Sequence, residues 1–329
     1  MKKRIIISVI LFIVLLLLTA ALKIWFAEVK VTERTYIYIE PQTTYTELGK
    51  QLQEKGILKN KTLFNLCAKA FGYDKVLKTG RYCAEPNMQI LTLVSRLKHG
   101  RQSPVRLVIG KSRIAEDFAE KMSQNLMFSA QDLLTELQKE GKTDSLFFFI
   151  VPNTYEIYWN VSPKDFISRM ERESVKFWQS KMQQLRTIGL SREQVIIIAS
   201  IVEEETNEQS EKARIAGVYI NRLNKGMPLQ ADPTIKYALK NFELKRITGE
   251  HLKVSSPYNT YRTQGLPPSP ICIPSMSSLN AVLNYEKHNF LFFCAREDFS
   301  GFHNFASNAK EHFANSRKYH QELNKRNIN

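Results

Sequence analysis

No Cys-x-x-Cys pair occurs among the four cysteines of this 329-residue chain, which stand at positions 67, 83, 272 and 294. Zinc sites built from thiolates commonly use such a pair, so the sequence gives little support to a metal site. Disulfides Cys67–Cys83 and Cys272–Cys294 are conceivable in an oxidising compartment, and four buried, reduced cysteines are at least as good an interpretation. We expect neither a metal nor an organic cofactor.

The sequence also lacks the signatures of nucleic-acid-binding proteins. Lys and Arg number 47 against 32 Asp and Glu, which gives a formal net charge of +15. This excess favours a polyanionic partner, such as nucleic acid, anionic lipid or an acidic cell-wall polymer. However, the basic residues are scattered, with no Arg-rich run and no zinc-finger, RRM or helix-turn-helix motif. We therefore expect no nucleic-acid partner.

One long apolar run stands near the N-terminus, from Ile5 to Leu22, behind the basic residues of segment 1–4. As a helix it measures about 27 Å, close to the roughly 30 Å hydrocarbon core of a bilayer. A cleavable signal peptide is the alternative, but its apolar region is usually only about 7–15 residues long. We predict an uncleaved transmembrane helix at 5–27, and no other stretch is long enough to cross a membrane.

The charges around this run predict an orientation. By the positive-inside rule, residues 1–4 lie in the cytoplasm and the chain after the helix lies outside. We therefore expect a single-pass protein of the cell (inner) membrane with an extracytoplasmic, or periplasmic, catalytic domain.

After residue 28 the pattern is that of a globular α+β protein, with 43% apolar and 11% aromatic residues and no internal repeat. A compact α+β module is predicted at 28–110, with strands at 29–40, 80–82 and 105–109 and helices at 44–56, 61–70 and 87–100. A second α+β domain is predicted at 111–329, with two short helices within 112–138, a buried strand at 147–151, a long helix at 163–185 and helices beginning near 192 and 216.

The most informative segment is the helix that begins near Arg192. Ser191-Arg-Glu-Gln194 forms a capping box, and residues 195–202 are apolar on all sides, which predicts a helix buried inside a domain. It ends in three consecutive glutamates, Glu203–Glu205, where acidic side chains oppose the helix macrodipole. A frayed helix end with hydrated acids is an equal alternative. A carboxyl in apolar surroundings, however, holds its proton to higher pH, as general-acid catalysis requires.

The three glutamates are not equivalent. Because successive helical residues turn by about 100°, Glu203 and Glu205 point in different directions. Glu205 continues the apolar stripe, whereas Glu204 is expected to be simply hydrated.

Two polar loops follow this helix. Gln230 and Asp232 lie in a turn-rich segment, and Tyr258 and Asn259 lie in a second one, where aromatic and amide groups alternate as they do in carbohydrate clefts. Taken singly, each of these motifs is explained equally well by a surface turn.

The order of the motifs is specific. It runs Ala199-Ser-Ile-Val-Glu-x-Glu205, Asn221-Arg-Leu223, Pro228-Leu-Gln-x-Asp-Pro-Thr234, Tyr258-Asn-Thr-Tyr261, Gly265-Leu-Pro-Pro268 and His303-Asn-Phe305. This pattern resembles the YceG-like family, the endolytic murein transglycosylases, over residues from about 35 to about 325. The resemblance is strong at 195–310 and diffuse before 110.

The resemblance implies a LysM-like module at 28–110 and a YceG-like catalytic domain at 111–329, behind the membrane helix. The implied enzyme is a lyase, a peptidoglycan lytic endotransglycosylase. It cleaves the MurNAc–GlcNAc bond of nascent glycan strands and leaves a 1,6-anhydro-MurNAc end. Peptidoglycan and the membrane are the implied partners, and cell-wall synthases are candidate protein partners.

The family motif implies Glu205 as the single general acid and then base, with Glu203 as the runner-up for that role. Glu203 is otherwise a nearby like charge that raises the pKa of Glu205. The substrate-binding residues implied beside Glu203 are Gln230, Asp232, Tyr258 and Asn259. This sequence has Glu204 where the family often has a lysine, and Cys272 lies near the proposed cleft.

Two alternatives remain at this point. A non-catalytic peptidoglycan-binding scaffold at the inner membrane would need no acid. A hydrolytic muramidase would use Glu205 with Asp232, since hydrolytic glycosidases usually need two carboxylates.

Overall fold

The computed structural model describes residues 2–58 and 61–326, which form two compact units. The first unit comprises the chain up to Arg106 together with 125–127 and 156–161, and the second comprises the rest. The prediction placed a single boundary at 110/111 and did not assign the segments 125–127 and 156–161 to the first unit.

The N-terminal run does form a helix, α1 (Lys2–Trp25). However, no helix in the described part of the chain is long and apolar enough to cross a membrane. The prediction of a transmembrane helix at 5–27 was therefore wrong. Residue 1 of the predicted cytoplasmic segment lies outside the described residues.

The first unit is built on one antiparallel strand pair, in which Ile37 lies opposite Tyr82. The apolar residues of this pair and of three amphipathic helices form one buried cluster, with Leu48, Phe64 and Leu93 fully buried. Thr44 caps the first of these helices through a capping box with Glu47. The elements are β1 (Thr35–Ile39), α2 (Tyr45–Glu54), α3 (Lys61–Ala70), a 3₁₀ turn (Tyr73–Lys75), β2 (Gly80–Ala84) and α4 (Ile90–His99).

The second unit is mainly helical. It contains the antiparallel hairpin of β5 (Phe292–Ala295) and β6 (His303–Ala306). Strand β3 (Val105–Ile109) pairs with β4 (Asn153–Ile157), and each of these two strands contributes residues to both units. The helices are α5 (Ala115–Ser123), α6 (Ala130–Lys139), α7 (Leu146–Phe149), α8 (Pro163–Ile188), α9 (Arg192–Glu205), α10 (Lys212–Asn224), α11 (Asp232–Ala238), α12 (Met276–Leu283) and α13 (Ala309–Lys325), with a 3₁₀ turn at His251–Lys253.

The predicted strand at 147–151 was wrong. Residues Leu146–Phe149 form the short helix α7, and the strand begins only at Asn153. A short apolar run carries no period that distinguishes a strand from a buried helical turn.

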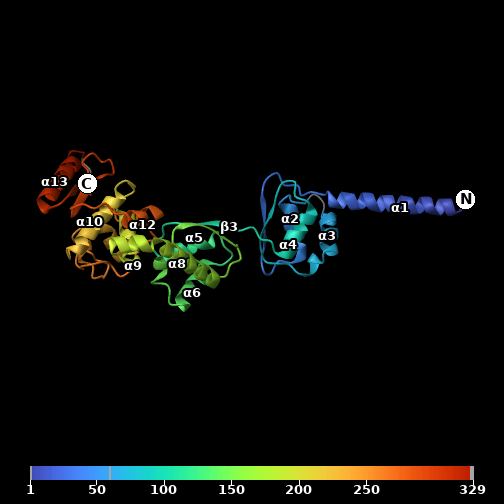
Figure 1. Cartoon of the computed structure of the whole chain (residues 1–329), viewed down its shortest axis with the longest axis horizontal. Coiled ribbons are helices and arrows are strands. Elements are labelled where there is room, and N and C mark those ends of the chain that lie inside the picture. Colours follow the sequence, from blue (N-terminus) through green and yellow to red (C-terminus); the bar gives the residue numbers. More distant parts are fainter. Residues whose placement is uncertain (1, 59–60, 327–329) are drawn as a thin grey trace. The chain divides into compact units, whose positions relative to one another are not determined.

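Helix α9 lies at the centre of the second unit's core (Figure 1) and packs against α10, α11 and α12. Ser191 caps it through a capping box with Gln194, as the sequence predicted. All residues from Val195 to Val202 are buried. The helix ends at Glu205 because Thr206 is extended, with φ −147° and ψ 142°. The core thus fixes the position of the three terminal glutamates.

All four cysteines are free, so neither conceivable disulfide is formed. Cys67, Cys83 and Cys272 are buried. Cys272 packs against α9, where its thiol lies 3.5 Å from the carbonyl oxygen of Ser200.

Candidate active site

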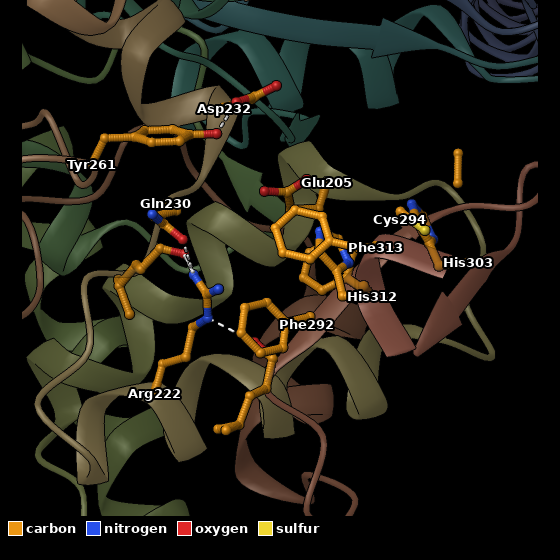
Figure 2. A pocket seen from close by; sticks show the side chains of 14 residues that line it. Glu205, Arg222, Gln230, Asp232, Tyr261, Phe292, Cys294, His303, His312 and Phe313 are labelled. Atoms are coloured by element: carbon orange, nitrogen blue, oxygen red, sulfur yellow. Dashed lines mark hydrogen bonds between the residues drawn. The ribbon is translucent and has the colours of Figure 1, made fainter. Parts of the chain in front are cut away.

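A cavity of about 610 Å³ opens beside the C-terminal end of α9. Figure 2 shows Glu205 between two groups of side chains: Asp232, Tyr261 and Gln230 on one side, and aromatic and imidazole rings on the other. The cavity is lined by Glu205, Arg222, Leu229, Gln230, Asp232, Tyr261, Leu291, Phe292, Phe293, Cys294, Ala295, His303, His312 and Phe313.

Glu205 is the carboxyl at the centre of this cavity. Its side chain keeps partial exposure and lines the cavity, while protein atoms crowd the carboxyl group. Its pKa is raised to about 7, mainly by burial and in addition by the charge of Asp232, against the opposing effect of a hydrogen bond from Tyr219. The Tyr219 hydroxyl donates to Glu205 Oε1 at 2.5 Å. A carboxyl with this pKa holds its proton for a large part of the time at neutral pH.

Glu203 faces a different environment and does not line this cavity. Lys212 Nζ lies 3.0 Å from its Oε2, and the hydroxyls of Ser275 and Ser278 donate to the same oxygen. Burial raises the pKa of Glu203, but these hydrogen bonds and the Lys212 charge outweigh it and lower the pKa overall. The charges that raise the pKa of Glu205 belong to Asp232 and Glu204.

Glu204 is held by two cations, contrary to the expectation that it is simply hydrated. Its side chain is 12% exposed. Arg113 binds it with two parallel bonds, Nε to Oε1 at 2.8 Å and Nη2 to Oε2 at 2.9 Å, and Lys111 Nζ lies 2.9 Å from Oε1. Burial raises the pKa of Glu204, but Arg113 and Lys111 outweigh it and hold the pKa low.

One wall of the cavity is polar, and we call it the polar wall: Arg222, Gln230, Asp232 and Tyr261. Arg222 Nη1 donates to Gln230 Oε1 at 3.1 Å and to the carbonyl of Leu229 at 2.7 Å. The Tyr261 hydroxyl donates to Asp232 Oδ1 at 2.5 Å. Gln230 has φ +53°, a left-handed conformation that is uncommon outside glycine. These side chains offer a ligand both hydrogen-bond donors and acceptors.

Thr260 joins the two loops that carry this wall. Its carbonyl accepts from the amide of Gln230 at 3.0 Å, and its hydroxyl oxygen accepts from the amide of Ala231 at 3.0 Å. The same hydroxyl lies 2.8 Å from the Thr234 hydroxyl. The Tyr-Asn-Thr-Tyr motif therefore fixes the loop that contains Gln230 and Asp232.

Tyr258 and Asn259 lie outside the cavity that contains Glu205. Asn259 is 1% exposed, and its side-chain amide donates to the carbonyls of Leu252 and Val254 at 2.9 and 2.8 Å. The Tyr258 hydroxyl lies 2.5 Å from the Ser269 hydroxyl, and Tyr258 lines a separate cavity of about 490 Å³. The structure thus brings together Glu205, Gln230 and Asp232, but not Glu203, Tyr258 or Asn259.

The Asn221-Arg222 pair holds the chain that leads into the hairpin β5–β6. The side-chain amide of Asn221 donates to the carbonyls of His288 and Phe290 at 2.8 and 3.0 Å. Arg222 Nε donates to the carbonyl of Leu291 at 2.7 Å. Helix α10 thereby positions the second wall of the cavity.

In the described residues 2–58 and 61–326, no group of three or more His, Cys, Asp and Glu side chains is arranged to hold a metal ion.

A model of the YceG-like family matches residues 37–318 of this sequence. The chain belongs to the YceG-like family. Residues 37–318 include both polar loops and the His303-Asn-Phe305 motif as well as the acidic end of α9.

Curated relatives of this YceG-like chain are named endolytic murein transglycosylases. One from Bacillus subtilis is 34% identical over 179 residues, which covers 54% of this chain and 49% of the relative. One from Streptococcus pneumoniae is 26% identical over 306 residues, which covers 82% of this chain and 55% of the relative. The chain thus spans about half the length of these relatives.

A crystal structure of a putative YceG-like protein from Listeria monocytogenes has a similar fold. The likeness has a TM-score of 0.54 at 27% sequence identity and covers 86% of this chain and 99% of that one. The names of the family, of the relatives and of this crystal structure do not mention a LysM-like module, so the LysM-like interpretation of the first unit stays a prediction.

Sequence reasoning missed several residues that line the cavity or contact Glu205. Tyr219, the hydrogen-bond partner of Glu205, lies in an apolar helix, where a tyrosine looks like an ordinary core residue. Arg222, Tyr261 and His303 stand in quoted motifs, so a signal was present, but nothing in the spacing distinguished them from Asn259. His312 lies in a charged helix with no family motif to mark it.

Proposed function

We propose that this YceG-like chain is a peptidoglycan lytic transglycosylase that cleaves the MurNAc–GlcNAc bond within glycan strands. The observation that carries the proposal is Glu205, a carboxyl with a pKa of about 7 that lines a 610 Å³ cavity. The names of the curated relatives support the substrate and the endolytic mode.

The proposed reaction uses one carboxyl twice. Protonated Glu205 donates its proton to the glycosidic oxygen, the bond from that oxygen to MurNAc C1 breaks, and an oxocarbenium-like centre develops at C1. The Glu205 carboxylate then accepts the proton of the C6 hydroxyl while O6 bonds to C1. The product is a 1,6-anhydro-MurNAc end, no water is consumed, and Glu205 is again protonated.

Tyr219 stabilises the deprotonated form of Glu205. Its hydroxyl donates to Glu205 and stabilises the carboxylate that forms when the proton leaves. Without this bond, burial would hold the proton on Glu205 more strongly and weaken it as a donor. In this proposal Gln230 and Asp232 bind sugar hydroxyls from the polar wall.

The predicted roles of the other residues stay predictions. Glu203, with its lowered pKa, is poorly suited to donate a proton. Tyr258 and Asn259 act in this proposal through the loops that they hold. We also propose that the catalytic unit works outside the cytoplasm, where its polymer lies, and that the first unit binds peptidoglycan in a LysM-like manner.

Digestion of purified sacculi with the full chain tests the proposal. We expect muropeptides with anhydro-MurNAc ends, identified by mass spectrometry. Glu205→Gln keeps the side-chain shape and removes the proton, so turnover should fall by about 10²-fold or more. Glu203→Gln is the matched control. Full activity of Glu205→Gln together with loss in Glu203→Gln would reverse the assignment.

A hydrolytic muramidase is the second candidate, because Asp232 also lines the cavity and its charge raises the pKa of Glu205. Two carboxylates on one cavity are the arrangement that hydrolytic glycosidases use. This candidate predicts reducing MurNAc ends in the same digest. Binding to sacculi without any new chain ends would instead indicate a scaffold.

A further inference from the structure

A buried carboxylate holds an imidazole at the edge of the cavity. Glu211 is 2% exposed, and His303 Nδ1 lies 2.9 Å from its Oε2. The backbone amide of His303 donates to both oxygens of the same carboxyl, at 3.2 and 3.1 Å. Glu211 therefore fixes both the backbone and the ring of His303.

This arrangement places a proton on the Nδ1 nitrogen of the ring. An ionised carboxylate can only accept hydrogen bonds, so Nδ1 of His303 must donate to Glu211. In the neutral ring Nε2 then has a free lone pair. Nε2 makes no hydrogen bond to the described residues of the protein, and the ring lines the cavity.

The same wall contains a second imidazole with an unused polar atom. Nδ1 of His312 is buried and has no hydrogen-bond partner among the described residues. Burial and the nearby Arg222 lower the pKa of His312, so its ring is neutral at pH 7. A buried polar atom without a partner requires an explanation, and a hydrogen bond to a bound ligand is one such explanation.

Aromatic side chains complete this wall. The His312 ring is stacked on Phe292, with centroids 5.2 Å apart, and Phe313 lines the cavity although it is 66% exposed. We call His303, His312, Phe292 and Phe313 the imidazole wall, which Figure 2 shows on the side of Glu205 away from Asp232.

Ring contacts connect this wall to the acid. Tyr219, which donates to Glu205, packs edge-on against Phe293 with centroids 5.9 Å apart. Phe293 in turn packs edge-on against His303 at 5.4 Å. Glu205 and His303 thus line one cavity and are connected by packed rings, so a single oligosaccharide can contact both.

We propose that the imidazole wall is a saccharide subsite in which Nε2 of His303 accepts a hydrogen bond from a sugar hydroxyl or acetamido N–H. Glu211 is its positioning residue, since it selects the tautomer that leaves Nε2 free to accept. This inference rests on the proposed function, because it assigns a substrate contact to the same cavity.

The sharpest variant is His303→Asn. The asparagine amide can replace the Nδ1 donor toward Glu211, but no acceptor remains at the position of Nε2. Glu205→Gln serves as the background, so that binding is measured without turnover, and chitotetraose is the probe. We expect its dissociation constant to rise about tenfold, which corresponds to about 1.4 kcal/mol. His320→Asn, on the exposed part of α13, is the matched control and should change it less than twofold.

A second probe identifies the sugar group. Cellotetraose has the hydroxyls but no acetamido groups. If His303 accepts from an acetamido N–H, only chitotetraose binding weakens in His303→Asn, and if it accepts from a hydroxyl, binding of both probes weakens. Unchanged binding of both probes would overturn the proposal.

The role of Glu211 has a readout that does not depend on activity. In the full chain, ¹⁵N NMR of the His303 ring should show Nδ1–H, and Glu211→Gln, whose amide can donate, should increase the Nε2–H form. A predominant Nε2–H form in the parent would contradict the proposed tautomer.

If the parent yields anhydro ends and His303→Asn keeps the parent KM, this inference fails while the proposed function stands. If the parent yields no anhydro ends, the proposed function fails, and the binding and NMR results still decide the subsite.

Discussion

Two neighbouring carboxyl groups at the end of α9 have opposite environments. On one side, Glu204 lies against the segment 111–113, where Lys111 and Arg113 keep its pKa low. On the other side, Glu205 lies against α10, where burial raises its pKa to about 7 and Tyr219 is its only side-chain hydrogen-bond partner among the described residues.

The difference shows that burial alone does not determine the protonation state. Burial is the largest influence on both residues and raises both pKa values. The cations near Glu204 reverse the outcome there, and a neutral hydroxyl near Glu205 does not. The proton donor thus depends on a difference in direct contacts: Arg113 and Lys111 are hydrogen-bonded to Glu204, whereas the charge of Lys236 lowers the pKa of Glu205 without a hydrogen bond to it.

The largest expected effect concerns stability against pH. Glu205 has a folded-state pKa of about 7, above its ordinary value of 4.5, so the folded protein binds the proton more tightly than the unfolded chain. Stability should therefore fall as the pH rises from about 4.5 to 7, by up to about 3 kcal/mol. Glu205→Gln should abolish this loss, as measured by urea denaturation at several pH values.

Glu204→Gln is the control for this comparison. The lowered pKa of Glu204 gives a stabilisation that is present above the unfolded pKa and lost as the pH falls through the folded one. Glu204→Gln should therefore be destabilised at pH 7 and approach the parent in acid. The same pH profile for both variants would show that the two environments do not differ as described.

A smaller effect is expected from Arg113→Ala, which removes the paired bonds to Glu204. The remaining Lys111 contact cannot replace them, so the free energy of unfolding should fall by about 1–2 kcal/mol. This is less than for a fully buried pair, because Arg113 is 37% exposed.

Arg192→Ala, at the other end of α9, is the matched control. The Arg192–Glu193 pair has exposed fractions of 38% and 47%, so its loss should cost less than about 1 kcal/mol. Denaturation curves of the two variants at pH 7 test the difference. Equal losses would mean that the Glu204 pair is no stronger than a surface pair.

The smallest effect is expected from Tyr219→Phe. It removes the hydrogen bond that lowers the pKa of Glu205, so this pKa should rise above about 7, by less than about one unit. If Glu205 acts as the acid, the alkaline limb of kcat/KM should move to higher pH by the same amount. A shift to lower pH would contradict the described role of Tyr219.

Periodicity and caps predicted much of the fold. The capping box at Ser191 placed the start of α9, the helix predicted at 61–70 has these bounds, and the helix predicted at 163–185 extends to Ile188. The N-terminal run and the segment 147–151 were misjudged, because a short or continuous apolar run does not reveal its surroundings.

The site was less predictable, because its chemistry depends on contacts between distant segments. Glu204 looked like the hydrated residue of the three, and its partner Arg113 lies 91 positions away. Asn259 looked like a sugar ligand, yet its amide binds backbone carbonyls inside the protein. Spacing along a helix gives the direction of a side chain but not the charge that it meets.

The backbone of Gln230 has a consequence for natural variation. A left-handed residue with a side chain costs roughly 1–2 kcal/mol more than glycine would, and glycine is one substitution that would relieve it. Glycine, however, would remove the amide that Arg222 holds at the cavity. Selection for thermal stability alone should therefore favour glycine at position 230, whereas selection for turnover alone should retain glutamine.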